Sequence, residues 1–127
     1  MTTEGAATAR SLLDRMEAAI AARDTAALDA LCVEDTVLFG TSAANFGGDE
    51  SRAYVRLVAE SNAVRWLLDR WAVVHEDDGH LLATATGVVE GDDGATIERF
   101  DFRLTLWLVR QGDQWRIGHF HGSVPQT

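Results

Sequence analysis

The stretch RFDFRLTLWLV, residues 99–109, alternates between apolar side chains and side chains of mixed character. Successive side chains of a β-strand point to opposite faces, so one face would carry only large apolar groups. The other would carry charges, a hydroxyl group and an indole ring. We therefore predict a long strand over residues 96–110, in a sheet with one dry and one amphipathic face. The apolar row comprises Phe100, Phe102, Leu104, Leu106 and Leu108, and the mixed row Arg99, Asp101, Arg103, Thr105, Trp107 and Val109.

Three more strands are predicted around this one, over residues 66–75, 80–90 and 114–123. The segments between them contain Asp-Gly or Gly-Asp pairs, which are typical of tight hairpin turns. The four strands would form an antiparallel meander.

The first half of the chain has helical periodicity instead. Residues 6–22 lack Gly and Pro and carry an apolar stripe, so they predict a helix. Asp24 is a suitable N-cap for a short second helix, and Asp49 for a third. Residues 35–40 predict a first strand. Helices followed by a meander indicate an α+β fold, in one domain over residues 1–127.

Composition excludes several classes of partner. The chain has 127 residues, 11 basic and 20 acidic, for a net charge of -9. Such a surface repels nucleic-acid phosphates and anionic membranes. Neither an export signal nor an apolar run long enough to span a membrane is evident. Cys32 is the single cysteine, which suits a reducing compartment, so we expect a cytoplasmic protein.

Three stretches resemble the SnoaL-like branch of the nuclear-transport-factor-2-like superfamily, which includes ketosteroid isomerase, polyketide cyclases and the kinase II association domain. They are DTVLFGT at residues 35–41, RLTLW at residues 103–107 and WRIGHFHGS at residues 115–123. The resemblance implies a cone-shaped, curved antiparallel sheet wrapped around three N-terminal helices, with an internal pocket. It also implies a homodimer formed through the outer face of the sheet.

The resemblance further implies which side chains face the pocket. By analogy with the isomerase, Arg103, Thr105, Trp107 and Phe120 would line it. The apolar row would then face a second subunit, with Phe100, Phe102, Leu104 and Leu106 in the dimer interface. A shift of one residue would exchange the two faces.

The chain departs from its relatives at two positions that matter for function. Thr105 aligns with the oxyanion-hole aspartate of the isomerase and cannot act as that acid. Gly122 stands where the kinase association domain has an arginine after its last histidine. Neither activity is therefore carried over.

Few other residues suggest chemistry. Tyr54, on the third predicted helix, is a candidate hydrogen-bond donor in the pocket. His119 and His121 lie on the same face of the last predicted strand. Asp101 lies on the same face of the long strand as two arginines. His119, His121 and Asp101 are reserve acid/base candidates. The H-x-H pair alone is a weak metal signal, so no metal or cofactor is predicted.

Two functions remain open. The first is binding of a small, partly apolar molecule, with or without cofactor-free isomerase, cyclase or hydrolase-type acid/base chemistry. The second is a non-catalytic dimerisation or assembly module. An open pocket without an inward-facing base would favour binding, and a pocket filled by its own side chains would favour assembly.

Overall fold

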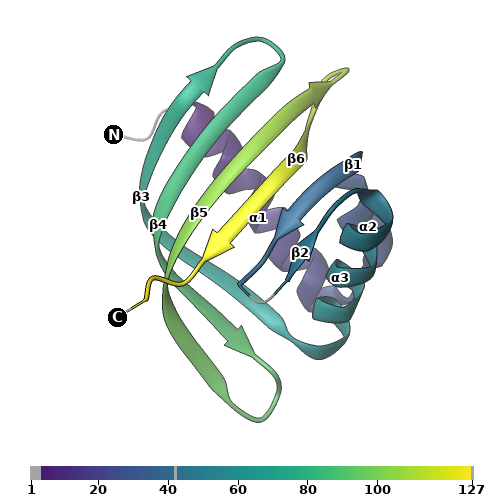
Figure 1. The fold of residues 1–127 in the computed structure, drawn as a ribbon, viewed down its shortest axis with the longest axis vertical. Coiled ribbons are helices and arrows are strands. Elements are labelled where there is room, and N and C mark those ends of the chain that lie inside the picture. Colours follow the sequence, from purple (N-terminus) through teal and green to yellow (C-terminus); the bar gives the residue numbers. More distant parts are fainter. Residues whose placement is uncertain (1–3, 42, 127) are drawn as a thin grey trace.

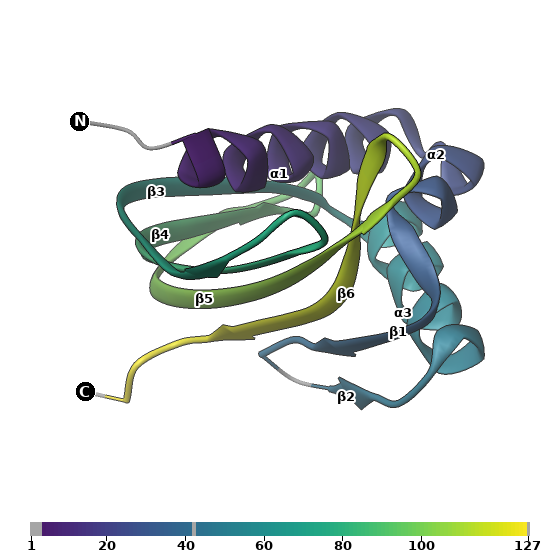
Figure 2. The ribbon, with the colours of Figure 1, turned by 90° about the horizontal axis from the view of Figure 1, so that it is seen from above.

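The computed structural model describes residues 4–41 and 43–126, which form three helices and one curved, unclosed sheet. The strand order is β2-β1-β6-β5-β4-β3, and α1 lies across one face of the sheet (Figure 1, Figure 2). The predicted α+β fold of helices and a curved sheet is confirmed. The elements are α1 (Glu4–Ala22), α2 (Thr25–Ala30), β1 (Cys32–Phe39), β2 (Ala44–Asn45), α3 (Gly48–Ser61), β3 (Ala63–Glu76), β4 (His80–Asp92), β5 (Ile97–Gln111) and β6 (Gln114–Ser123).

The meander from β3 to β6 is antiparallel throughout, as predicted. The first strand adds a feature that the sequence did not indicate. β1 runs parallel to β6, with Leu38 opposite Phe120, so the complete sheet is mixed. β1 therefore brings the N-terminal half of the chain against its last strand.

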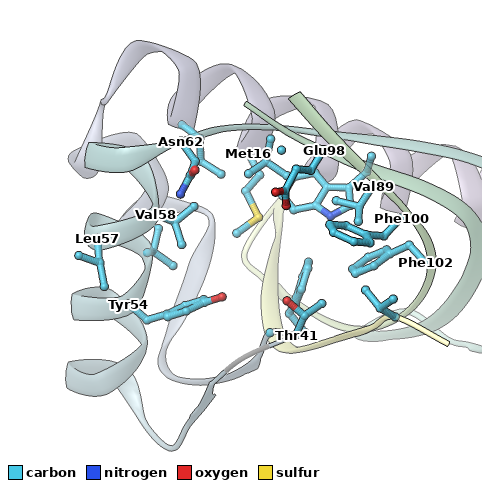
Figure 3. Close-up of a pocket in the computed structure, with 18 of the residues that line it drawn as sticks. Met16, Thr41, Tyr54, Leu57, Val58, Asn62, Val89, Glu98, Phe100 and Phe102 are labelled. Atoms are coloured by element: carbon cyan, nitrogen blue, oxygen red, sulfur yellow. The ribbon is translucent and has the colours of Figure 1, made fainter. Parts of the chain in front are cut away.

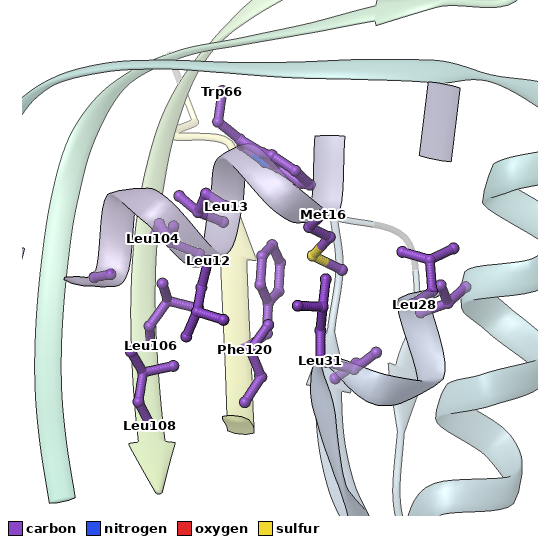
Figure 4. Close-up of a cluster of buried hydrophobic side chains, with 14 of the residues drawn as sticks. Leu12, Leu13, Met16, Leu28, Leu31, Trp66, Leu104, Leu106, Leu108 and Phe120 are labelled. Atoms are coloured by element: carbon purple, nitrogen blue, oxygen red, sulfur yellow. The ribbon is translucent and has the colours of Figure 1, made fainter. Parts of the chain in front are cut away.

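The core lies between α1 and the inner face of the sheet. Figure 4 shows Leu12 and Leu13 of α1 close to the leucines of β5, and Met16 of α1 beside Phe120 of β6. Leu106 and Leu108 are completely buried there. Full burial of each such side chain contributes about 1.5–3 kcal/mol to folding. No helix of the described residues is long and apolar enough to cross a membrane.

This packing reverses the predicted assignment of the two faces of β5. The apolar row was expected to meet a second subunit, but it is the row that covers the apolar stripe of α1. The physical reason is that α1 needs a continuous apolar surface, and only this row provides one. Phe102, Leu104 and Leu106 are 4%, 1% and 0% exposed, and Phe100 shares their side of β5, so these four do not form an outer interface. Arg103, Thr105 and Trp107 lie on the opposite, outer face.

The two short-range capping predictions had different outcomes. Asp24 caps α2 as predicted, because its Oδ1 accepts a hydrogen bond from the backbone N–H of Ala27 at 3.1 Å. Asp49 does not cap α3. The N-cap is Gly47, whose φ of +84° is a conformation that other residues rarely adopt. A backbone conformation that favours glycine therefore begins this helix.

Buried hydroxyl groups fix α3 to the sheet. Ser51 Oγ donates to the carbonyl oxygen of Thr36 at 2.8 Å. Thr36 Oγ1 in turn donates to the carbonyl oxygen of Ile117 at 2.9 Å. Both hydroxyl groups are buried, and a buried hydroxyl without a hydrogen-bond partner would lower the stability of the fold. Each of the two hydrogen bonds removes that penalty. This chain links α3, β1 and β6 and sets the distance between α3 and the sheet.

Candidate functional site

A cavity of about 790 Å³ opens between α3 and the inner face of the sheet. Figure 3 shows Tyr54 and Val58 of α3 on one side of it, and Phe100 and Phe102 of β5 on the other. The end of the β4–β5 hairpin, which extends beyond β6 in Figure 1, supplies the rim. Elements far apart in the sequence therefore enclose the site.

The walls of the cavity are mainly apolar and aromatic. Trp66 and Phe120 meet edge to face in the wall, with ring centroids 5.8 Å apart. Met16, Leu38 and Val89 also line it. Pockets for small organic molecules have this composition, because apolar walls gain free energy by excluding water from the ligand.

Tyr54 offers the cavity a hydroxyl group. Within the described part of the chain, this hydroxyl has no hydrogen-bond partner, so it is free to bind a ligand atom. Burial raises the pKa of the Tyr54 phenol, because the charged form is poorly solvated there. The group therefore stays neutral at pH 7 and can both donate and accept. Asn62, which follows α3, adds an amide to the same lining.

Two carboxylates stand at the rim. Glu98 lies on the same side of β5 as Phe100 and Phe102, and it lines the cavity. Asp93 organises the β4–β5 turn: its Oδ1 accepts hydrogen bonds from the backbone N–H groups of Thr96 at 2.8 Å and Ala95 at 2.9 Å. These hydrogen bonds, led by that of Thr96, lower the pKa of Asp93, so its negative charge is maintained.

Two of the five predicted pocket residues line the cavity, and the other three lie elsewhere. Tyr54 and Phe120 line the cavity. Arg103, Thr105 and Trp107 do not, because they belong to the outer row of β5. Trp107 instead stacks on the ring of His80, with centroids 5.2 Å apart and planes inclined by 16°.

The reserve acid/base candidates also lie on the outer side of the sheet. His119 Nδ1 donates to the carbonyl oxygen of Val37 at 2.8 Å. Both His119 and His121 meet the ring of Phe39 edge to face, at centroid distances of 5.2 and 5.4 Å. Asp101 is exposed opposite Val88. In residues 4–41 and 43–126, no group of three His, Cys, Asp or Glu side chains is placed to hold a metal ion.

Sequence reasoning missed Glu98, Asn62 and Trp66 as lining residues. For Glu98 a signal was present, because it continues the alternation of Phe102 and Phe100 by one more step. Asn62 and Trp66 carried no such signal, since their approach to the cavity depends on how α3 and β3 are placed relative to β5.

The single cysteine takes no part in the site. Burial raises the pKa of the Cys32 thiol to about 11, and the side chain packs against the core. A thiol that remains protonated at neutral pH is a poor nucleophile.

Comparison with known proteins identifies the family. Residues 9–127 match the model of the SnoaL-like domain. No functionally curated protein matches the sequence.

Solved structures share the fold at low sequence identity. An NTF2-like protein from Streptomyces avermitilis, provisionally named a dehydratase, has a TM-score of 0.82 and 15% identity, over 94% of this chain and 95% of that chain. A Xanthomonas campestris protein, provisionally named a calcium/calmodulin-dependent protein kinase II association domain, has a TM-score of 0.75 and 20% identity, over 92% and 85%. An NTF2-like protein of unknown function from Pseudomonas putida has a TM-score of 0.74 and 24% identity, over 96% and 89%.

Identities of this size establish a common fold and carry no activity from one protein to another. The family match is stronger evidence, because it extends over nearly the whole chain and includes every strand of the sheet. The protein thus belongs to the family of SnoaL-like domains.

Proposed function

We propose that the protein binds a small, partly apolar molecule in the cavity between α3 and the sheet. The observation that carries this proposal is the cavity itself, whose volume of about 790 Å³ is not filled by the side chains around it. Ligand sites in proteins commonly measure about 300–1,000 Å³. Contiguous apolar surface that is left open to solvent is typical of ligand-binding grooves.

The polar groups of the cavity would orient such a ligand. The hydroxyl of Tyr54 and the amide of Asn62 belong to the α3 side, and aromatic rings form much of the sheet side. A planar or branched apolar molecule with one polar substituent could pack against the aromatic rings and form a hydrogen bond with the α3 side. Leaving the Tyr54 hydroxyl unpaired beneath an apolar ligand would cost about 1–3 kcal/mol, which disfavours purely hydrocarbon molecules.

Binding is favoured over acid/base catalysis by where the titratable groups lie. His119, His121 and Asp101 are all on the outer face, so none of them reaches a bound molecule. Thr105, which the resemblance aligns with the isomerase acid, is on the outer face as well, so it does not occupy the place of that acid. Among the described residues that line the cavity none is a histidine. The carboxylates there, Asp93 and Glu98, are exposed at the rim, so no carboxylate base lies deep in the described lining.

A pair of neighbouring valines tests the proposal. Val89 lines the cavity, whereas Val88 points to the outer face of the same strand. Val89→Phe should fill the space and weaken binding of 2-naphthaleneethanol, a neutral two-ring probe, at least tenfold by calorimetric titration. Val88→Phe should leave the affinity unchanged. Equal affinity in wild type and Val89→Phe, or no binding by the wild type, would contradict the proposal.

A homodimer formed through the outer face is a second, compatible inference. The outer row of β5 includes Trp107 and Val109, both half-buried, and Figure 2 shows α1 on the other side of the sheet. Apolar area on an uncovered sheet face is typical of interaction surfaces. A chain that forms dimers while its cavity binds no probe would instead support the assembly-module function.

A further inference from the structure

We propose that the cavity selects amines, that is, molecules with a cationic head group on an apolar body. This inference rests on the proposed ligand-binding function and adds the charge of the ligand to it. Three features support it: the absence of basic side chains from the described lining of the cavity, the carboxylates at the rim, and the aromatic rings beside them.

The alternation of β5 keeps Arg99 and Arg103 away from the cavity. Arg99 and Arg103 point to the outer face, whereas Glu98 points to the inner face. Arg99 is already engaged outside, where its Nε donates to Glu90 Oε2 at 2.7 Å. Arg65 Nη1 lies 3.7 Å from the other oxygen of Glu90. No arginine or histidine belongs to the described lining of the cavity.

The carboxylates at the rim are available to a cation. Glu98 has neither a hydrogen-bond nor an ion-pair partner within the described residues. Asp93 uses Oδ1 for the turn, and within residues 4–41 and 43–126 its Oδ2 has no hydrogen-bond or ion-pair partner. Both stand at the mouth of a cavity large enough for the rest of a molecule, on a chain with a net charge of -9. An anionic ligand would be repelled on approach and a cation attracted.

Aromatic side chains next to these carboxylates favour a cation further. Phe100 is the next inward residue after Glu98 on β5, and 46% of it is exposed toward solvent. The face of an aromatic ring attracts an ammonium group, most strongly where water is partly excluded. An amine at the rim would interact with Glu98 and Phe100, while its apolar body occupies the space lined by Trp66 and Phe102.

Three probes with a common naphthalene body test the inference: 2-naphthaleneethylamine, 2-naphthaleneethanol and 2-naphthaleneacetate. At pH 7 they are cationic, neutral and anionic. Calorimetric titration of the wild type should give affinities in the order amine, alcohol, carboxylate. The amine should bind about tenfold more tightly than the alcohol, as expected for one ion pair plus one cation–π contact near the surface. Sodium chloride should weaken only binding of the amine.

Variants of Glu98 separate a local contact from the general field of the protein. In Glu98→Gln, the affinity for 2-naphthaleneethylamine should fall to within about threefold of that for 2-naphthaleneethanol. In Glu98→Lys, 2-naphthaleneacetate should become the preferred probe. Glu60→Gln is the matched control, because it removes an exposed carboxylate of α3 that does not line the cavity. It should retain the preference for the amine.

The outcomes distinguish the two proposals. If the alcohol binds as tightly as the amine, or if Glu98→Gln keeps the preference, amine selection is wrong and ligand binding stands. If none of the three probes binds to the wild type, the ligand-binding function and the inference built on it are both overturned.

Discussion

The Tyr54 hydroxyl reaches the cavity because the residue beside it has no side chain. A Cβ atom at Gly40 would overlap the hydroxyl oxygen of Tyr54. Gly40 does not have a positive φ, so glycine is not required there by the backbone. The missing side chain thus leaves room for a phenol that can bind a ligand.

Replacing this glycine should change binding more than stability. In Gly40→Ala the new methyl group should turn the end of the Tyr54 ring away and weaken probe binding by about 1 kcal/mol, the value of a typical hydrogen bond. Gly91→Ala is the matched control, since Gly91 also lines the cavity but a Cβ there meets no atom within 4 Å. Calorimetric titration with 2-naphthaleneethanol measures the difference. Equal losses in the two variants would show that the Tyr54 hydroxyl does not contact the ligand.

The strand β5 has two very unequal faces. Leu106 is completely buried against α1, while its neighbour Thr105 is half-buried on the outer side. The two residues therefore contribute very differently to folding, although they are adjacent in the chain.

A pair of alanine variants tests this arrangement. Leu106→Ala should lower the free energy of unfolding by about 2–5 kcal/mol, because it leaves a cavity beneath α1. Thr105→Ala should change it by no more than about 0.5 kcal/mol. Urea denaturation of the purified variants measures both values. A larger loss for Thr105→Ala would mean that the two faces are assigned the wrong way round.

Local sequence patterns predicted most of the elements. The bounds of β6, residues 114–123, agree fully, and α1 and β5 agree within two residues at each end. Helix and strand periodicity are local, so they are visible in one sequence. The start of α3 could not be seen in the sequence in this way, because it depends on the backbone conformation of Gly47 and not on a side-chain pattern.

The face assignment of β5 failed for a different reason. The resemblance to the isomerase places the apolar row outside, whereas a continuous row of five large apolar side chains is typical of a core, and the core is where the row lies. The parity of a strand is a non-local property, since it depends on what packs against each face. Asn62 and Trp66 were difficult to predict as cavity residues for the same reason, because they meet the β5 side chains only once three elements are assembled.

For the molecule as a whole, we expect the uncovered face of the sheet to mediate self-association. Sedimentation equilibrium at micromolar concentration should report a mass of two chains. Trp107→Arg should shift the equilibrium to monomers, because it buries a charge at the centre of the inferred interface. Leu57→Arg, an equally drastic change at the exposed rim of the cavity, should remain dimeric. A monomeric wild type would exclude the dimer.

The parallel pairing of β1 with β6 has a consequence for biosynthesis. β1 leaves the ribosome early, yet its partner β6 is the last strand of the sheet to be made. The apolar stripe of α1 also stays uncovered until β5 has been synthesised. The nascent chain therefore exposes apolar surface through most of translation. Such surface attracts chaperones and other nascent chains. Folding of this domain is therefore completed only after the β6 segment has left the exit tunnel, and a ribosome stalled before that point would hold an aggregation-prone intermediate.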